Sequence, residues 1–401
     1  MASFSFQKET KPANVTDQNW SDWTWQLRNS LKSRQDFERY FTLSAAEIAG
    51  FTGGQELFNI RTTPYYASLV SQNEQDPLRR IFMPRKEELE PGLQAMSDPL
   101  AEKRNQASSR LIHRYSDRVL FLVTDICSVY CRFCTRKHFT GADQALIKPE
   151  EYKQALDYIS SHPGIREVIL SGGDPLTLSD SQLDRILFDL RKIPHLEIIR
   201  IGTRMPVVAP QRITTELVQI LRKHKPVFLM THFNHPRELT ATAAVAVENF
   251  VDHGVPVMNQ MVLLNGVNNH PAIVQALSRR LLYLRAKPYY MFQCDPSIGT
   301  DHLRTSIDNS LEIQKELWGH LSGLAMPTFA VDIPKGGGKV VYTPNFEIGA
   351  VNKVDPFSKR QYRGWDGVEA EYVNPPTEKI VKPLDYEVYV EEWERLKSAK
   401  S

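Results

Sequence analysis

From residue 118 to about residue 332, short apolar segments alternate with segments of helical periodicity, and this pattern constrains the fold more than any other feature. In one helical segment, Leu183, Ile186, Leu187 and Leu190 recur at the spacing of one helix face. Strand–helix repeats whose strands are apolar on both faces form parallel sheets. The pattern therefore predicts an α/β fold with strands at residues 119–125, 167–170, 197–201, 227–233, 255–264, 288–294 and 328–332.

Six strand–helix units followed by one further strand are too few to close an eight-stranded barrel, so we predict a partial (βα)6 parallel barrel in residues 113–342. Residues 1–112 are predicted to form a tail and a helical region, whose short helices are separated by prolines. Residues 343–401, with many prolines and charges, are predicted to form an extended C-terminal arm. Such arms often make subunit contacts, so we expect a homo-oligomer.

Composition excludes several kinds of partner. With 49 Lys and Arg against 47 Asp and Glu, the formal charge of +2 gives no electrostatic basis for binding nucleic acid or an anionic membrane. The N-terminal residues lack the apolar core of a signal peptide, and no apolar run has the length of a membrane span. Four cysteines, three of them within eight positions, are not a disulfide framework. We therefore expect a cytoplasmic protein in a reducing compartment.

Three of the four cysteines, Cys127, Cys131 and Cys134, follow the first predicted strand as C-x3-C-x2-C. Three thiolates are one fewer than the four that complete most iron–sulfur clusters and structural zinc sites. A [4Fe–4S] cluster on three thiolates keeps one iron open, and S-adenosylmethionine can chelate it through its amino and carboxylate groups. Electron transfer into the sulfonium then releases a 5′-deoxyadenosyl radical. Zinc or chance clustering are the alternatives, and the place directly after a first strand favours the cluster.

A second candidate for chemistry is Lys339, which follows the glycine run 336–338 after the last predicted strand. A lysine beside glycines also suggests a phosphate-binding loop, but the next residues, Val340-Val341-Tyr342, lack the Ser or Thr and the helix of that motif. An amine on a loop over a barrel mouth suits a Schiff base with pyridoxal 5′-phosphate (PLP). We therefore predict that Lys339 is catalytic and binds PLP.

The residues around the cysteine motif resemble those of one enzyme family. His113-Arg114-Tyr115-Ser116-Asp117-Arg118, then the cysteine motif, then Thr135-Arg136, are similar to the lysine 2,3-aminomutases of the radical S-adenosylmethionine (radical SAM) superfamily. The similarity extends from about Trp20 to at least Gly367. It implies a barrel of the radical SAM type, an electron donor for the cluster and an isomerase that moves an amino group between neighbouring carbons.

The resemblance also implies roles for residues that are ambiguous by themselves. The turn Gly172-Gly173-Asp174 after the second strand, and His232 after the fourth, are implied to bind SAM, although Gly-Gly turns and lone histidines are commonly structural. Arg136 is implied to pair with the substrate's α-carboxylate. A guanidinium also suits a phosphate, and the residues implied to bind PLP are Arg114, Tyr115, Arg118 and Gln260.

Two aspartates, Asp295 and Asp332, each at the end of a predicted strand, indicate the substrate. Two carboxylates at one barrel mouth tolerate burial when a cation joins them, and the ε-ammonium of lysine is such a cation. In the related glutamate enzyme the two positions are not both acidic. We therefore predict interconversion of L-lysine and β-lysine. The alternatives are arginine as substrate, β-lysine supply for the modification of an elongation factor, and a non-catalytic iron–sulfur redox sensor.

Two departures from the family pattern affect these predictions. Lys335 stands where the family's loop usually has another glycine, so a second amine lies near Lys339. Well-known members bind a structural zinc through a mid-chain cysteine and a C-terminal cysteine cluster. Here His270 occupies the former region and no cysteine follows Cys294, so we predict no structural zinc.

Overall fold

A computed structural model describes residues 4–137, 139–140, 147–349, 359–373 and 386–398. Its centre is a ten-stranded sheet whose strands follow one another in chain order. All seven predicted strands are present and pair in parallel, with ends shifted by at most two residues. They are β3 (Arg118–Thr124), β4 (Glu167–Gly172), β5 (Ile198–Gly202), β6 (Val227–Thr231), β7 (Val257–Leu263), β8 (Lys287–Gln293) and β9 (Thr328–Ile333).

Short antiparallel strands extend both edges of this sheet. β1 (Gln106–Ser108) and β2 (Leu111–Tyr115) precede β3, and β10 (Gly338–Val341) pairs with β9. The prediction of a loop around Lys339 is therefore wrong, because this residue lies in β10. The glycines before it suggested a loop, but Gly338 adopts a positive φ of 88° and begins the strand directly after the turn. Among the described strands β1 and β10 are not paired with each other, so the barrel is open.

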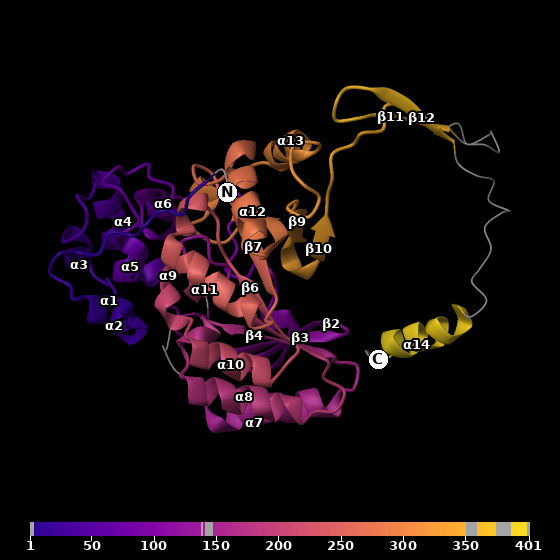
Figure 1. Ribbon diagram of the computed structural model, residues 1–401, viewed down its shortest axis with the longest axis horizontal. Helices are drawn as coiled ribbons and strands as arrows, with labels where there is room; N and C mark the ends of the chain where they lie inside the picture. Colours follow the sequence, from indigo (N-terminus) through magenta and orange to yellow (C-terminus); the bar gives the residue numbers. More distant parts are fainter. Residues whose placement is uncertain (1–3, 138, 141–146, 350–358, 374–385, 399–401) are drawn as a thin grey trace.

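Helices cover the outer side of the sheet (Figure 1). The α8 helix (Asp180–Arg191) begins at Ser179, whose side chain accepts a hydrogen bond from the backbone of Gln182, and it buries all four apolar residues of the predicted face. The other long connecting helices are α7 (Pro149–Ser161), α10 (Thr215–Lys223), α11 (Ala241–Asp252), α12 (Pro271–Tyr283) and α13 (Ile307–Leu317). Short helical segments are η3 (Pro175–Thr177), α9 (Met205–Val208), η4 (Pro210–Arg212), η5 (Pro236–Glu238), η6 (Asp301–Leu303) and η7 (Pro334–Gly336).

The N-terminal region packs against one side of the barrel through buried polar contacts. Tyr66 donates a hydrogen bond to Glu238 at 2.5 Å, and Tyr65 shares one with Thr240, both across more than 170 residues of sequence. Because these groups are buried, the contacts fix how the region docks. Its helices are α1 (Asp17–Ser21), α2 (Trp23–Arg28), α3 (Arg34–Glu38), α4 (Ala45–Leu57), α5 (Pro64–Ala67), α6 (Arg79–Phe82), η1 (Lys86–Leu89) and η2 (Lys103–Asn105).

The C-terminal elements follow β10 at the end of the chain (Figure 1), and the hairpin among them contacts the segment after α13, where the Trp365 ring lies 5.3 Å from that of His320. They are a hairpin of β11 (Lys359–Arg363) and β12 (Glu369–Val373), and the helix α14 (Tyr386–Ser398). Every residue of β12 is exposed, so the hairpin adds no strand to the main sheet. In the described part of the chain, no helix combines the length and the apolar character required to cross a membrane.

Candidate active site

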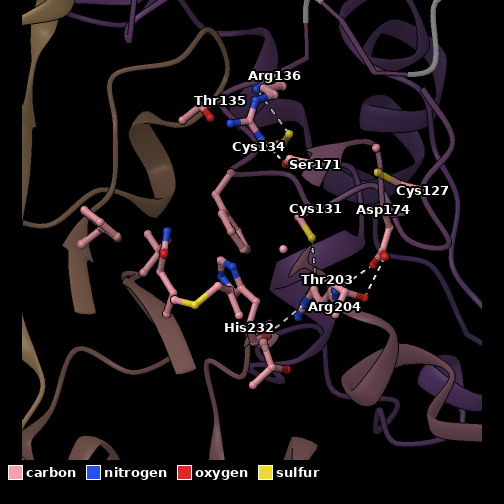
Figure 2. Close-up of a pocket in the computed structure, with 18 of the residues that line it drawn as sticks. Cys127, Cys131, Cys134, Thr135, Arg136, Ser171, Asp174, Thr203, Arg204 and His232 are labelled. Atoms are coloured by element: carbon pink, nitrogen blue, oxygen red, sulfur yellow. Dashed lines mark hydrogen bonds between the residues drawn. The ribbon is translucent and has the colours of Figure 1, made fainter. Parts of the chain in front are cut away.

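The carboxyl ends of the parallel strands surround a cavity of about 320 Å³. Arg114, Tyr115 and Arg118 are grouped beside Lys339 at the edge of this cavity. Figure 2 shows the cysteines, His232 and their hydrogen-bonded neighbours around it. The predicted site residues that line it are Cys127, Cys131, Cys134, Arg136, Gly173, Asp174, His232, Gln260, Asp295, Asp332 and Lys339.

Two glycines allow the cysteine loop to lie directly on the end of β4. A Cβ on Gly172 would lie 2.2 Å from the carbonyl oxygen of Thr124, and one on Gly173 would lie 2.2 Å from that of Ile126. Gly172 also has a positive φ of 119°. The Gly173 backbone N–H donates to the Thr124 carbonyl at 2.6 Å. The glycines thus have a packing reason, and their contact with SAM stays a prediction.

The three cysteine thiols border one common volume. Burial raises the pKa of the Cys131 and Cys134 thiols, and the Arg204 guanidinium opposes this at Cys131, where its Nη1 lies 2.7 Å from Sγ. Among the described residues no three His, Cys, Asp or Glu side chains converge as they would around a single metal ion. A cubane instead spreads its thiolates over separate irons. Three half-buried cysteines on one cavity, with a cation beside them, therefore fit a [4Fe–4S] cluster.

Arg204 joins several parts of the site and was missed in the sequence analysis. Its Nη2 donates to Glu238 at 2.7 Å and to the Tyr66 hydroxyl at 3.0 Å, and its backbone N–H donates to Asp174 at 2.7 Å. Asp174 also accepts from Thr203 at 2.7 Å, so its carboxylate ties the end of β4 to the end of β5. The available signal was the place of Thr203-Arg204 just beyond the strand predicted at residues 197–201, where polar residues collect in this architecture.

His232 follows β6 and lines the cavity. Its ring stacks on Phe133 with the ring centroids 5.4 Å apart. Burial, with a contribution from the Arg204 charge, lowers the pKa of His232 to about 3. Its Nε2 is buried and has no hydrogen-bond partner in the described part of the chain. A buried polar atom of this kind on a cavity wall fits contact with a ligand.

Arg136 lies between the cysteine loop and the N-terminal region. Its Nε donates to the Glu102 carboxylate at 3.0 and 3.3 Å, and its Nη1 donates to the Ser171 hydroxyl at 3.1 Å. Its backbone N–H lies 3.3 Å from the Cys134 sulfur. The predicted carboxylate-binding group is therefore held beside the cysteines, by a glutamate that the sequence analysis did not single out.

Asp295 and Asp332 are both brought to the opposite wall. Asp332 lies in β9 directly opposite Lys339 in β10, so the two side chains share one face of the sheet. Arg114 Nη1 is 3.7 Å from Asp332 Oδ1, which accepts no hydrogen bond from the described residues. Burial and the neighbouring Asp332 charge raise the pKa of Asp295 to about 7, although Lys339 and Arg114 oppose the shift. The two carboxylates therefore repel each other on this wall, and the cations of Arg114 and Lys339 offset that repulsion only in part.

Lys339 is surrounded by aromatic and cationic groups. Its Nζ lies 5.3 Å from the centre of the Phe292 ring and 5.8 Å from that of Tyr115. The Arg118 guanidinium lies 4.0 Å from the Tyr115 ring centre, and Arg114 lies 5.5 Å from it. An amine beside two guanidinium groups and a phenol fits a phosphorylated aldehyde such as PLP.

Lys335 occupies a different environment from Lys339. Both lysines are exposed, but Lys335 is absent from the cavity lining that includes Lys339, and its backbone N–H donates to the Pro99 carbonyl at 3.2 Å. Its φ of 62° lies in the left-handed region that favours glycine. This conformation explains why a glycine is usual at this place in the loop.

His270, at the place of the family's mid-chain zinc ligand, caps a helix. Its Nδ1 accepts a hydrogen bond from the Ala272 backbone N–H at 3.2 Å at the start of α12. The ring thus has a structural use. The expectation of no structural zinc stays a prediction.

Comparisons with known proteins agree with this geometry. The model of the Radical SAM superfamily matches residues 121–274, and a model described as Lysine-2,3-aminomutase matches residues 314–395. An L-lysine 2,3-aminomutase of Fusobacterium nucleatum is 44% identical over 364 residues, covering 90% of this chain and 84% of the relative. One of Clostridium subterminale is 43% identical, covering 90% and 86%. A glutamate 2,3-aminomutase of Clostridioides difficile is 37% identical, covering 94% and 88%.

Proposed function

The chain belongs to the lysine 2,3-aminomutase family of radical SAM isomerases, and from this premise we propose that it interconverts L-lysine and β-lysine. The reaction moves the amino group from the α-carbon to the β-carbon. The relatives named above include enzymes for lysine and for glutamate, so the family alone leaves the choice of amino acid open. Because the family consists of isomerases, we no longer consider the alternative that the protein is a non-catalytic redox sensor.

The pair Asp295 and Asp332 is the observation that favours lysine. Asp332 Oδ1 is buried with no hydrogen bond from the described residues, and the raised pKa of Asp295 reflects burial and repulsion. A bound ammonium group relieves both penalties, because it pairs with two carboxylates in a place of low dielectric constant. A substrate carboxylate in the same place would add a third negative charge. The wall therefore selects an amino acid with a cationic side chain.

The cofactor and substrate contacts follow from the two walls. Cys127, Cys131 and Cys134 would hold the cluster, and His232 would contact the adenosyl group of SAM. Cluster and SAM together supply reductive C–S bond cleavage, which begins radical chemistry. Lys339 would bind PLP covalently, with Arg114, Tyr115, Arg118 and Gln260 on its polar groups; PLP supplies a conjugated ring that delocalises charge or an unpaired electron.

The chain's own residues then have two tasks. Arg136 grips the α-carboxylate at one end of the substrate, and the two aspartates grip the ammonium at the other end. Two fixed ends place the α- and β-carbons between the cysteine wall and Lys339, which is the positioning that a radical reaction requires. Apolar side chains such as Val262, Phe133 and Phe292 line the same cavity and limit the access of water to it.

An anaerobic assay of the loaded enzyme with reductant tests the proposal. Lysine, arginine and glutamate are supplied separately, and the β-amino acid products are quantified. We expect lysine to be the best substrate and glutamate to be turned over at least about a hundredfold more slowly, because a repelled charge costs several kcal/mol. Faster turnover of glutamate than of lysine would disprove the aspartate argument, and faster turnover of arginine would change the substrate but not the charge class.

A further inference from the structure

Glu102 lies outside the barrel and contacts Arg136, the arginine predicted to bind the substrate's α-carboxylate. Its carboxylate accepts from Arg136 Nε at 3.0 and 3.3 Å, and the two side chains are 10% and 22% exposed. Glu102 precedes the short helix η2 in the N-terminal region, 34 residues before its partner. A charged pair with so little exposure is strongly oriented, because water competes little for the hydrogen bonds.

The backbone of Glu102 is itself fixed by neighbouring contacts. The Asp98 carboxylate accepts from the backbone N–H groups of Glu102 and Lys103 at 2.9 and 3.0 Å. Two residues before Asp98, the backbone of Met96 both donates to and accepts from the loop that follows Asp295. Pro99 accepts from the turn that precedes Lys339. The segment 96–102 thus contacts Arg136, the loop that follows Asp295 and the turn that precedes Lys339.

The contact determines which edge of the guanidinium remains for a ligand. An arginine has five N–H donors and binds a carboxylate through two parallel ones. In Arg136 the Nε donor is directed to Glu102 and an Nη1 donor to Ser171, whereas Nη2 donates to no described residue. With Nε engaged, the pair that can bind a carboxylate is Nη1 and Nη2. Glu102 therefore sets the orientation of the arginine before substrate arrives.

A second pair in the same loop provides a contrast. Arg132 is held by both carboxylate oxygens of Glu88, also from the N-terminal region, and its Nη1 donates to the Asn59 carbonyl at 3.1 Å. These two side chains are 0% and 1% exposed, and neither residue lines the cavity. The Glu88 pair therefore anchors the loop, whereas the Glu102 pair lies where a ligand can reach the arginine.

We propose that Glu102 is a positioning residue that orients Arg136 for the α-carboxylate of the substrate and so contributes to the selection of amino acids over simple amines. This inference rests on the proposed function, since it takes Arg136 as the carboxylate-binding group. It predicts a specific signature. Loss of Glu102 weakens binding of a ligand that has the carboxylate and leaves unchanged the binding of one that lacks it.

The test compares L-lysine with 1,5-diaminopentane, which is lysine without its carboxylate. Equilibrium dialysis of radiolabelled lysine, and its competition by diaminopentane, is performed on enzyme loaded with cluster, SAM and PLP but without reductant, so that no turnover occurs. For Glu102→Ala we expect lysine to bind on the order of tenfold more weakly, the size of one charge-assisted hydrogen bond. Diaminopentane should bind as in the wild type, and Glu102→Gln should restore part of the lysine affinity because its amide oxygen can still accept from Nε.

Two further variants separate the possible outcomes. Glu88→Gln removes the structural partner of Arg132 and should leave the ratio of the two affinities unchanged. Arg136→Met should weaken lysine more than Glu102→Ala does. If Arg136→Met lowers lysine affinity while Glu102→Ala leaves it unchanged, or weakens both ligands equally, the positioning role is wrong and the proposed function stands. If neither variant affects lysine, the assignment of Arg136 fails and the present inference fails with it.

Discussion

The two walls of the cavity differ in how the protein pairs their charged side chains. On the cysteine wall, Arg136 and Arg204 each have a carboxylate partner from another part of the chain, and so does Arg132, which supports the cysteine loop away from the cavity. On the aspartate wall, Asp332 Oδ1 has no hydrogen bond from the described residues, and the pKa of Asp295 is raised to about 7. The first wall is an organised support. On the second, two carboxylates repel each other, and under the proposed function a cationic ligand would relieve this repulsion.

This difference separates residues that maintain structure from residues that bind. A buried ion pair that loses one partner costs stability, because the other charge remains buried and unpaired. Removing a buried carboxylate that already repels its neighbour has the opposite effect on stability. The empty protein becomes more stable, but ligand binding is weakened. The predictions below test this contrast, beginning with the largest expected effect.

Replacing Lys339 by alanine should remove activity almost completely. We expect turnover to fall by more than about 10³-fold, as for the loss of a residue bonded to the cofactor. Borohydride reduction of the PLP-loaded protein, followed by peptide mass spectrometry, should find the pyridoxyl label on Lys339 in the wild type and none in the variant. The control is Lys335→Ala, which should keep the label; a label on Lys335 in the wild type would contradict the assignment.

The variant Glu88→Gln tests the buried ion pair that supports the cysteine loop. Because Arg132 would remain buried with its charge only partly paired, we expect a loss of about 3–5 kcal/mol in the free energy of unfolding, measured by urea denaturation. The matched control is Glu47→Gln, which breaks the fully buried pair with Arg79 in the same region and should cost a similar amount. A loss below about 1 kcal/mol in Glu88→Gln would show that this pair does not anchor the loop.

Asp295→Asn tests the aspartate wall. The kcat/KM for lysine should fall by about a hundredfold, since a buried charge partner of the ammonium is lost. The empty protein should nevertheless be more stable by about 1 kcal/mol above pH 7, because the repulsion with Asp332 disappears. Iron content should not change. If the variant loses stability and retains lysine turnover, Asp295 maintains the structure and does not bind the substrate, which contradicts the contrast drawn between the two walls.

The raised pKa of Asp295 also predicts a dependence on pH. Its folded pKa of about 7 exceeds the usual value of an aspartate, so this group makes the native state less stable as the pH rises from about 4 to 7. Binding has the opposite trend, because the ammonium requires the ionised carboxylate. We expect kcat/KM for lysine to rise as the pH increases through about 7, and the rise should be absent in Asp295→Asn. An unchanged profile in the variant would assign the titration to another group.

Lys335→Gly should have the smallest effect. The left-handed conformation at Lys335 costs a side chain about 1 kcal/mol, and glycine avoids this cost but loses more chain entropy on folding. We therefore expect a gain of at most about 1 kcal/mol in the free energy of unfolding, with PLP loading unchanged. Loss of PLP in this variant would give Lys335 a role in the site.

The parallel strands could be predicted from the sequence because each is a short, mostly apolar segment that lies between segments of helical periodicity. The edge strands could not be predicted, because they are short and carry few apolar residues. For this reason a loop was predicted at Lys339, where the structure has β10. Arg204 and Glu102 were missed for a different reason. Their partners Cys131 and Arg136 lie 73 and 34 residues away, and local periodicity contains no information about such pairs.

By itself the sequence determined the spacing of the cysteine motif, from which the iron–sulfur cluster is predicted, and the order of the parallel strands, since both depend on the positions of residues along the chain. Only the tertiary structure decided which charged groups meet. The register of β9 and β10 places Lys339 opposite Asp332, and docking of the N-terminal region brings Glu102 to Arg136. Electrostatic energy depends on distance in space and on burial, and neither follows from separation along the chain.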